Sequence, residues 1–391
     1  MWGWSAAAVV RVLKIAVLLL PAWVANAQTV EEQRLDLAQE KIPAVVAVHA
    51  DLVKQFSERL AAVANPAELI VIVNHYAGLL WHQARENVQH SVTGDDRPLY
   101  WSRLALSRYL RQQSFPFEFD LAARQQRLAQ LERASRGHDD IRYADATERV
   151  FVTGFDPFRL DAAIDQSNPS GLAALALDGN VLQIGKRAIR IEAVLIPVRF
   201  ADFDQGLIES VLTPILRDPA MKLVTTISMG RSGFDLERFP GRRRSADAFD
   251  NVNTKTGGSA KRPVLPLLDG ASLAGAEFVE FSLPARSMQS VQQPFPVTDN
   301  GKVTTLAGSV TASVLSDLRY HTAVGGSGGG YLSNEISYRS IRLRDELGLH
   351  LPVGHVHTPA VRGYDAGIEH QIVQQLEQML RAALDSAGSV R

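Results

Sequence analysis

The residues best suited to catalysis lie in a glycine-rich stretch, residues 325–334, which contains two serines. The stretch falls between a predicted strand and a predicted helix, so a serine hydroxyl there would face the free N–H groups at the positive end of the helix. Those groups stabilise the oxyanion that develops when a serine attacks a carbonyl carbon. Ser327 satisfies the nucleophile-elbow pattern G-x-S-x-G, whereas Ser333 lies at the helix start, where serine is also a common cap. The stretch therefore predicts acyl transfer with two competing nucleophiles.

Two histidines downstream and an acidic segment upstream offer the other members of a catalytic triad. His355 and His357 belong to the sequence Gly-His-Val-His-Thr-Pro, at the end of a short apolar segment. Because side chains alternate along a strand, we expect at most one of the two histidines to face the site. The base must in turn be oriented by a third group, and the segment 235–238 (Asp-Leu-Glu-Arg) contains acidic residues for that role. From these residues alone, the choice within each pair stays open.

The elements that must position these residues alternate between strands and helices from about residue 147 onward. This alternation is typical of an α/β sheet covered by helices on both faces, with functional loops at the carboxyl ends of the strands. We predict strands at 149–153, 189–198, 222–227, 278–283 and 319–324, and helices at 202–216, 332–347 and 368–384. The segment 241–263 is expected to form a long surface loop with solvated charges at Arg242, Arg243 and Arg244.

Three motifs, in the right order and spacing, resemble the pyroglutamyl peptidase I (pyrrolidone-carboxylate peptidase) family over residues 149 to about 360. They are Val-Thr-Gly-Phe-Asp-Pro-Phe at 152–158 with Asn-Pro-Ser at 168–170, Gly-Arg-Ser through Glu-Arg at 230–238, and Gly-Gly-Tyr-Leu-Ser-Asn at 329–334 with Gly-His-Val-His-Thr-Pro at 354–359. The resemblance implies an α/β fold with a mixed sheet flanked by helices. It also implies a hydrolase that removes an N-terminal pyroglutamyl or similar residue and needs no metal or cofactor.

The resemblance assigns a role to each matched residue. It implies Ser333 as nucleophile, His357 as general base and acid, Glu237 as the group that orients the histidine, Phe155 and Phe158 as a sandwich for the flat pyroglutamate ring, Asn168 in substrate binding, and Ser327 and His355 as scaffold. The substrate would be a peptide or a small cyclic amide.

The sequence departs from the family pattern at the nucleophile and at the recognition residues. Ser333 occupies the position of the family's catalytic cysteine, so His357 must remove its proton during the attack. The family's glutamine falls at about Ile227, and its arginine near Asp247, although the cluster 242–244 could supply a replacement from a shifted loop. We therefore expect the amide edge of a pyroglutamate to be read differently or not at all.

Residues 28–146 are predicted to form an α-helical N-terminal region ahead of the α/β domain at 147–391. His82, Glu86 and His90 repeat every four residues, so they would share one helix face and could hold a metal. Neighbouring apolar residues such as Leu80 and Trp81 favour a packed or interface stripe instead. We allow for a homo-oligomer and for a protein partner bound through residues 28–146.

The first 27 residues have the features of a signal peptide. Arg11 and Lys14 precede the apolar run 15–20, and Ala25-Asn26-Ala27 supplies the small residues of a cleavage site. An N-terminal membrane anchor is the alternative. The chain contains no cysteine, which excludes disulfides, thiolate metal sites and a cysteine nucleophile. Its 41 basic and 42 acidic side chains do not suggest a nucleic-acid partner.

The sequence thus predicts an exported protein, periplasmic or secreted, with an α-helical N-terminal region and a pyroglutamyl-peptidase-like α/β domain. The preferred function is an omega peptidase or amidohydrolase with a Ser333–His357–Glu237 triad. The alternatives are a catalytically inactive homologue that binds a cyclic ligand and an envelope assembly protein that acts through its N-terminal helices.

Overall fold

The computed structural model describes residues 28–91, 94–143 and 148–388. The predicted signal peptide, residues 1–27, lies outside the described residues. Within the described ranges, no helix combines the length and the apolar character needed to cross a bilayer.

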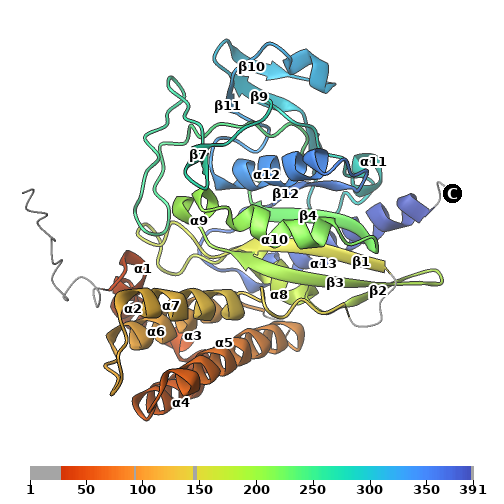
Figure 1. Cartoon of the computed structure of the whole chain (residues 1–391). Coiled ribbons are helices and arrows are strands. Elements are labelled where there is room, and N and C mark those ends of the chain that lie inside the picture. The colour runs from red at the N-terminus through yellow and green to blue at the C-terminus, as the bar shows by residue number, and fades with distance from the viewer. Residues whose placement is uncertain (1–27, 92–93, 144–147, 389–391) are drawn as a thin grey trace, which may run out of the picture.

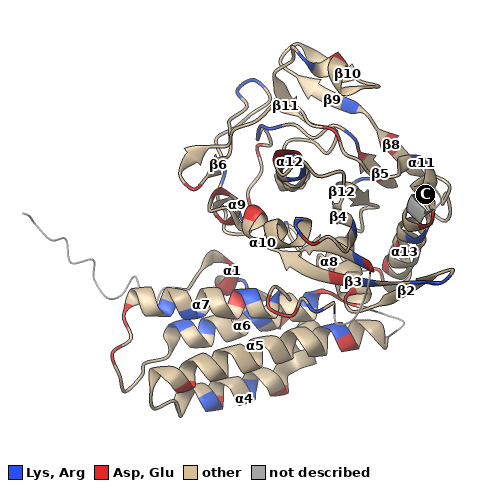
Figure 2. Ribbon diagram, turned by 45° about the vertical axis from the view of Figure 1, so that its right-hand side comes forward, with Lys and Arg blue, Asp and Glu red and all other residues tan. Residues whose placement is uncertain are grey.

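The N-terminal region is helical, as expected. It contains α1 (Val30–Gln33), α2 (Leu35–Lys41), α3 (Pro43–Val46), the 3₁₀ helix η1 (Ala47–His49), α4 (Ala50–Ala61), α5 (Pro66–Gln89), α6 (Arg97–Gln112) and α7 (Leu121–Ser135). The turn signal Asn65-Pro66 starts α5, because the Asn65 side chain accepts a hydrogen bond from the N–H of Glu68 and Pro66 fits the first helical position. Basic and acidic residues are interspersed along α4 to α7 (Figure 2), which agrees with the net charge near zero.

The rest of the chain is built on a seven-stranded mixed sheet in the order β2-β3-β1-β4-β12-β5-β8. The strands are β1 (Glu148–Phe155), β2 (Val181–Ile184), β3 (Arg187–Ile196), β4 (Met221–Met229), β5 (Phe234–Glu237), β8 (Val297–Asn300) and β12 (Val353–Thr358). The central strands β3, β1, β4 and β12 are parallel, whereas β2 and β5 are antiparallel to their neighbours β3 and β12. Most residues of the parallel strands are buried because both faces of the sheet are covered.

Helices cover both faces of this sheet (Figure 1). On one face, α8 (Pro169–Leu177) packs against β1 and β3 and against α13 (Ala366–Gly388). On the other, α12 (Leu332–Glu346) packs on β12 and β4 beside α10 (Leu207–Leu216). The N-terminal region joins this body through α5, which packs on α8. The predicted fold class, a mixed sheet flanked by helices with an N-terminal helical region, is confirmed.

Three predicted elements differ from the structure. Gly206, at φ 76°, divides the predicted helix 202–216 into α9 (Phe200–Asp204) and α10. The predicted strand 278–283 is an irregular segment whose N–H groups bond to carbonyls of residues 238 and 240, so its alternating pattern reflects packing on a loop. Of the predicted strand 319–324, only β11 (Ala323–Gly325) forms, and it belongs to a separate sheet.

The smaller elements surround the loops of the large sheet. The three-stranded sheet that contains β11 has the order β10-β9-β11, with β9 at Lys302–Thr305 and β10 at Gly308–Thr311. The remaining short elements are β6 (Leu267–Leu268), β7 (Ala271–Ser272), α11 (Ala285–Met288) and the 3₁₀ helix η2 (Leu315–Leu318).

The loop 241–263 is anchored by its arginines, so the prediction of solvated charges is wrong for this cluster. Arg244 is only 5% exposed and donates to both Glu335 and Asp204. Arg242 and Arg243 both bind Glu277. A long arginine side chain can bury its guanidinium when carboxylates satisfy its donors, and local sequence does not reveal those distant partners.

Candidate active site

A cavity of about 70 Å³ lies where β1 and β4 end and α12 begins. Its walls are formed by Phe155, Phe158, Asn168, Val198, Ser228, Met229, Tyr331, Leu332 and Ser333. It therefore brings together the predicted aromatic pair, the predicted asparagine and the predicted nucleophile. This location, at the carboxyl ends of parallel strands, is the usual place for a ligand in an open α/β sheet.

The two predicted substrate loops, residues 152–158 and 168–170, are joined by hydrogen bonds beside the cavity. Asn168 donates from Nδ2 to the carbonyl of Asp156 at 2.9 Å, and its Oδ1 accepts from the N–H of Ser170 at 3.1 Å. Ser170 Oγ accepts from the N–H of Phe155 at 3.1 Å. A side chain at Gly154 would place its Cβ 2.1 Å from the Ser170 carbonyl oxygen, so only glycine allows this close approach. The two motifs thus form one rigid wall.

His357 and Glu237 form the predicted base and orienting pair. They come together because β12 and β5 are neighbouring strands of the sheet. His357 Nδ1 lies 2.5 Å from Glu237 Oε1, and the Glu237 carboxylate is fully buried. Asn300 Nδ2 and Arg231 Nη2 also donate to Glu237, at 2.9 and 3.2 Å. A carboxylate accepts hydrogen bonds, so the proton of a neutral His357 lies on Nδ1 and Nε2 is left to act as a base.

Gly328 lies between the nucleophile candidate and this pair. Ser333 Oγ donates to the carbonyl oxygen of Gly328 at 3.4 Å. A Cβ on Gly328 would lie 3.4 Å from His357 Cε1 and 3.6 Å from Glu237 Cγ. Within the described chain, no hydrogen bond joins Ser333 to His357, so the Ser333 hydroxyl must turn away from this carbonyl before His357 can take its proton.

The competing serine, Ser327, is held in a structural role. The N–H of Ser327 donates to the carbonyl oxygen of Phe239, and the N–H of Phe239 donates to Ser327 Oγ. Both hydrogen bonds are 3.0 Å long. Its side chain is buried, and it does not line the cavity. Ser333, at the second residue of α12, lies instead at the cavity wall among the N–H groups of the first helical turn, which have no acceptor within the helix.

The two histidine rings lie on the same side of β12, so the expectation that at most one faces the site is wrong. Their ring centroids are 4.9 Å apart, because residues two positions apart on a strand share a face. Their partners separate their roles. His355 is fully buried and uses both ring nitrogens on Thr226 and Ser228, and burial lowers the pKa of its imidazole well below the usual range.

The arginine cluster 242–244 does not replace the family's recognition arginine, because none of its members lines the cavity. Asp250 and Asn251, farther along the same loop, hydrogen-bond to the backbone next to the cavity instead. Asn251 Nδ2 donates to the carbonyl of Pro157 at 2.8 Å, and Asp250 accepts from the N–H of Phe200 at 2.9 Å.

Buried charges from the N-terminal region bind both predicted substrate loops, a contact that the sequence did not reveal. Arg103 Nη2 donates to Asp156 Oδ1 at 2.6 Å, and Arg136 donates to the other carboxylate oxygen. Asp96 accepts from the N–H of Asn168 at 3.1 Å. The only signal was Asp156 itself, the one charged residue of the motif 152–158, and nothing in the sequence distinguishes its two partners among 41 basic residues.

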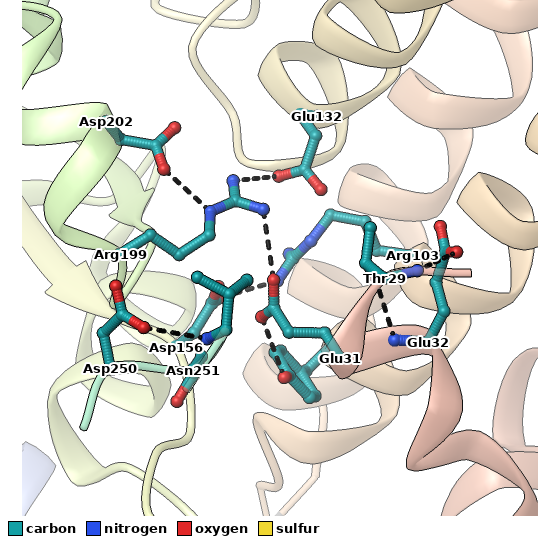
Figure 3. A network of polar contacts seen from close by, with 12 residues as sticks. Thr29, Glu31, Glu32, Arg103, Glu132, Asp156, Arg199, Asp202, Asp250 and Asn251 are labelled. Carbon is teal, nitrogen blue, oxygen red and sulfur yellow. Dashed lines mark hydrogen bonds and ion pairs between the residues drawn. The ribbon is translucent and has the colours of Figure 1, made fainter. Parts of the chain in front are cut away.

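The same polar interface continues at Arg199 (Figure 3), which follows the cavity residue Val198 in the sequence. Arg199 reaches from the α/β domain to Glu31 of α1 at 3.2 Å and to Glu132 of α7 at 3.0 Å. Burial raises the pKa of the Glu31 carboxyl even though Arg199 opposes that shift. The helices and the α/β domain therefore share one polar interface rather than a loose contact.

The buried carboxyl group of Glu369, next to the Asn-Pro-Ser loop, makes the stability of the fold depend on pH. Burial raises the pKa of Glu369 to about 8, although the hydroxyl of Ser167 donates to its carboxylate. The pKa of Asp96 is also raised by burial, with the charge of Glu369 as the next cause. Because the folded protein keeps the Glu369 proton that the unfolded chain releases near pH 4.3, its contribution to stability is present below that pH and lost as the pH rises towards 8.

We therefore expect the unfolding free energy of Glu369→Gln, relative to that of the unsubstituted protein, to increase by about 2–4 kcal/mol as the pH rises from 5 to 8. Urea unfolding at a series of pH values measures this difference. Glu377→Gln on the same helix, where the side chain is 34% exposed, is the matched control and should show no such trend. A constant difference between Glu369→Gln and the unsubstituted protein at all pH values would contradict the prediction.

The helix-face metal site does not form among the described residues, which contain no group of three or more metal-binding side chains. His82 Nδ1 lies 3.6 Å from Asp140, and His90 Nδ1 lies 2.9 Å from the backbone carbonyl of Glu86. The adjacent Leu80 and Trp81 are buried, as a packed stripe requires.

Two family models match the chain. The PA0049 N-terminal domain matches residues 21–132, and the PA0049 C-terminal domain matches 149–277 and 286–362, which is more than half of the 391 residues. The chain belongs to the PA0049 family. A relative, Uncharacterized protein PA0049 of Pseudomonas aeruginosa, is 28% identical over an alignment of 412 positions, and the match covers 80% of this chain and 74% of the relative.

Beyond the PA0049 family, the chain is similar to solved structures of pyrrolidone carboxyl peptidase from Pyrococcus furiosus. A mutant of that enzyme is 19% identical, with a TM-score of 0.43, and the match covers 61% of this chain and 99% of the enzyme. A structure of the enzyme reported together with its cysteine-free mutant is also 19% identical, with a TM-score of 0.43.

Proposed function

We propose that this protein is an exported hydrolase that removes an N-terminal pyroglutamyl or similar cyclic amide residue through a Ser333–His357–Glu237 triad. One observation carries the proposal: a single small cavity has Ser333, Phe155 and Phe158 in its walls and lies at the start of a helix. A flat lactam ring offers two apolar faces, which suit two phenylalanine side chains. The buried His357–Glu237 pair lies directly behind the glycine-rich loop that carries Ser333.

Each step of the reaction falls to a named group. Ser333 Oγ forms a bond to the substrate carbonyl carbon while His357 Nε2 takes the hydroxyl proton. The resulting oxyanion is stabilised by free N–H groups at the start of α12. His357 then protonates the leaving amine as the carbon–nitrogen bond breaks, and water releases the acyl group from Ser333 by the same route in reverse. Glu237 holds His357 in the required tautomer throughout.

The test combines turnover with covalent trapping. Purified protein is expected to release the fluorophore from a pyroglutamyl-aminocoumarin substrate, and a fluorophosphonate should add one molecule per chain, at Ser333, as located by peptide mass spectrometry. The absence of both fluorophore release and a Ser333 adduct would contradict the hydrolase.

One observation favours a second candidate, a binding protein that holds a cyclic ligand without turnover. Ser333 Oγ is bonded to Gly328 and not to His357 among the described residues. Saturable binding of pyroglutamamide by the unsubstituted protein, without hydrolysis or labelling of Ser333, would support this candidate over the hydrolase.

A further inference from the structure

Ser228 is a polar residue of the cavity wall that the proposed reaction does not use. It lies next to the end of β4 and is only 5% exposed. Its Oγ lies 2.8 Å from His355 Nε2, and the other ring nitrogen, Nδ1, lies 2.8 Å from Thr226 Oγ1. Thr226, His355 and Ser228 therefore form a hydrogen-bonded chain that ends at the cavity.

We infer the direction of this chain from the arrangement in which every hydroxyl and ring N–H of the three residues has an acceptor. Thr226 has one hydroxyl proton, which it donates to the carbonyl oxygen of Gly354 at 3.4 Å. Its oxygen then accepts from His355, so the single proton of the neutral imidazole lies on Nδ1. His355 Nε2 is left as an acceptor and must receive the hydroxyl proton of Ser228. Ser228 has thus used its only proton, and its oxygen presents lone pairs.

The other polar side chains of the cavity wall already have partners. Asn168 donates to the carbonyl of Asp156 and accepts from Ser170. The hydroxyl of Tyr331 donates to the carbonyl of Phe249 at 2.8 Å. Ser333 is the nucleophile of the proposed reaction, so its oxygen bonds to the substrate carbonyl carbon. Tyr331 and Ser228 each keep lone pairs on an oxygen whose proton is already donated, and Ser228 is the more deeply buried of these two acceptors in the described cavity wall.

We propose that Ser228 Oγ accepts the ring N–H of the substrate, and that the Thr226–His355–Ser228 chain makes the cavity selective for cyclic amides over cyclic esters. This inference rests on the proposed function and adds the group that reads the ring. A lactam supplies an N–H at the edge of its flat ring, whereas a lactone places an oxygen there. With a lactone, two acceptors meet without a proton between them, which a closed site penalises.

The experiment compares two ligands that differ in one ring atom. Pyroglutamamide and its lactone analogue, 5-oxotetrahydrofuran-2-carboxamide, are titrated by calorimetry into Ser333→Ala protein, which prevents turnover. We expect the lactam to bind about 10–100 times more tightly, since an unpaired buried acceptor costs about 1–3 kcal/mol. Adding Ser228→Ala should reduce this ratio to about threefold or less.

Two valine substitutions in β4 test the chain behind Ser228. Thr226→Val removes the group that fixes the proton of His355, and should lower the lactam preference without changing the cavity wall. Thr225→Val is the matched control, because Thr225 is equally buried on the opposite face of the strand, and should leave the ratio unchanged. Thermal unfolding of each variant checks that it is folded.

The outcomes separate the two levels of the proposal. If both ligands bind equally well, or if the preference survives Ser228→Ala, the role of Ser228 is wrong while the cyclic-ligand pocket stands. If neither ligand binds to any folded variant, the proposed function fails and this inference fails with it.

Discussion

Ser333→Ala is expected to lower kcat for pyroglutamyl-aminocoumarin hydrolysis by about 10⁴–10⁶-fold, because removal of a triad nucleophile leaves only binding and oxyanion stabilisation. KM should change little, since Ser333 is one of nine residues around the cavity and the aromatic walls remain. Initial rates measured over a range of substrate concentrations separate the two parameters. This large fall in kcat at constant KM is the expected result for a group that acts in the transition state.

Ser327→Ala is the matched control for this prediction. Ser327 belongs to the same glycine-rich loop, but its hydroxyl accepts from the N–H of Phe239 and does not reach the cavity. Its replacement should lower stability and leave kcat within about tenfold of the starting value. If Ser327→Ala abolishes turnover while Ser333→Ala retains it, the assignment of the nucleophile is wrong.

The variant Ser333→Cys distinguishes a protein that binds the substrate but has lost hydrolysis from one whose cavity does not bind the substrate. A thiol ionises more readily than a serine hydroxyl, so it depends less on alignment with His357. If the unsubstituted protein is silent and Ser333→Cys gains turnover, the cavity binds the substrate and the serine form has lost the chemistry. If the unsubstituted protein, Ser333→Ala and Ser333→Cys all fail to hydrolyse the substrate, the cavity binds another ligand.

Asp156→Asn is expected to destabilise the protein by about 3–5 kcal/mol, since it leaves a buried arginine without its counter-ion. Arg103 is fully buried, its Nη2 donates to Asp156, and two further donors, Nε and Nη1, have no partner in the described part of the chain. Arg136 is affected less, because Glu132 also accepts from it at 2.8 Å. Urea unfolding followed by tryptophan fluorescence measures the loss.

A double substitution and an exposed pair control this second prediction. Adding Arg103→Met to Asp156→Asn removes the uncompensated charge, so the double variant should recover part of the lost stability. Asp36→Asn breaks an ion pair with Arg108 in which the aspartate side chain is 80% exposed, and should cost less than about 1 kcal/mol. Equal effects of Asp156→Asn and Asp36→Asn would contradict the role given to Asp156.

The N-terminal region therefore does more than extend the chain. Asp156 lies between Phe155 and Phe158 in sequence, so its two arginines hold the backbone of the aromatic pocket. Asp96 holds the Asn-Pro-Ser loop in a similar way. Helices and pocket are expected to respond together to substitutions at this interface, because the buried charges on each side need the other.

The sequence by itself determined the layout of the fold and the residues of the candidate site. Alternating strand and helix patterns predicted β1, β3, β4 and α12 within a few residues, since burial on both faces of a sheet favours apolar segments that are visible locally. The resemblance to pyroglutamyl peptidases implied Phe155, Phe158, Asn168 and Ser333 as site residues, and all four lie in the wall of one cavity. Membership of the PA0049 family, by contrast, came from comparison with known proteins.

Only the tertiary structure decided which of these residues are partners. The pairing of Glu237 with His357 depends on β5 lying antiparallel beside β12, and the chain from Thr226 to Ser228 depends on the register between β12 and β4. The burial of Arg103 on Asp156 depends on how the helices dock. Local periodicity records which face of an element is buried, but not what lies against it, because the partner is set by register and docking between segments far apart in the sequence.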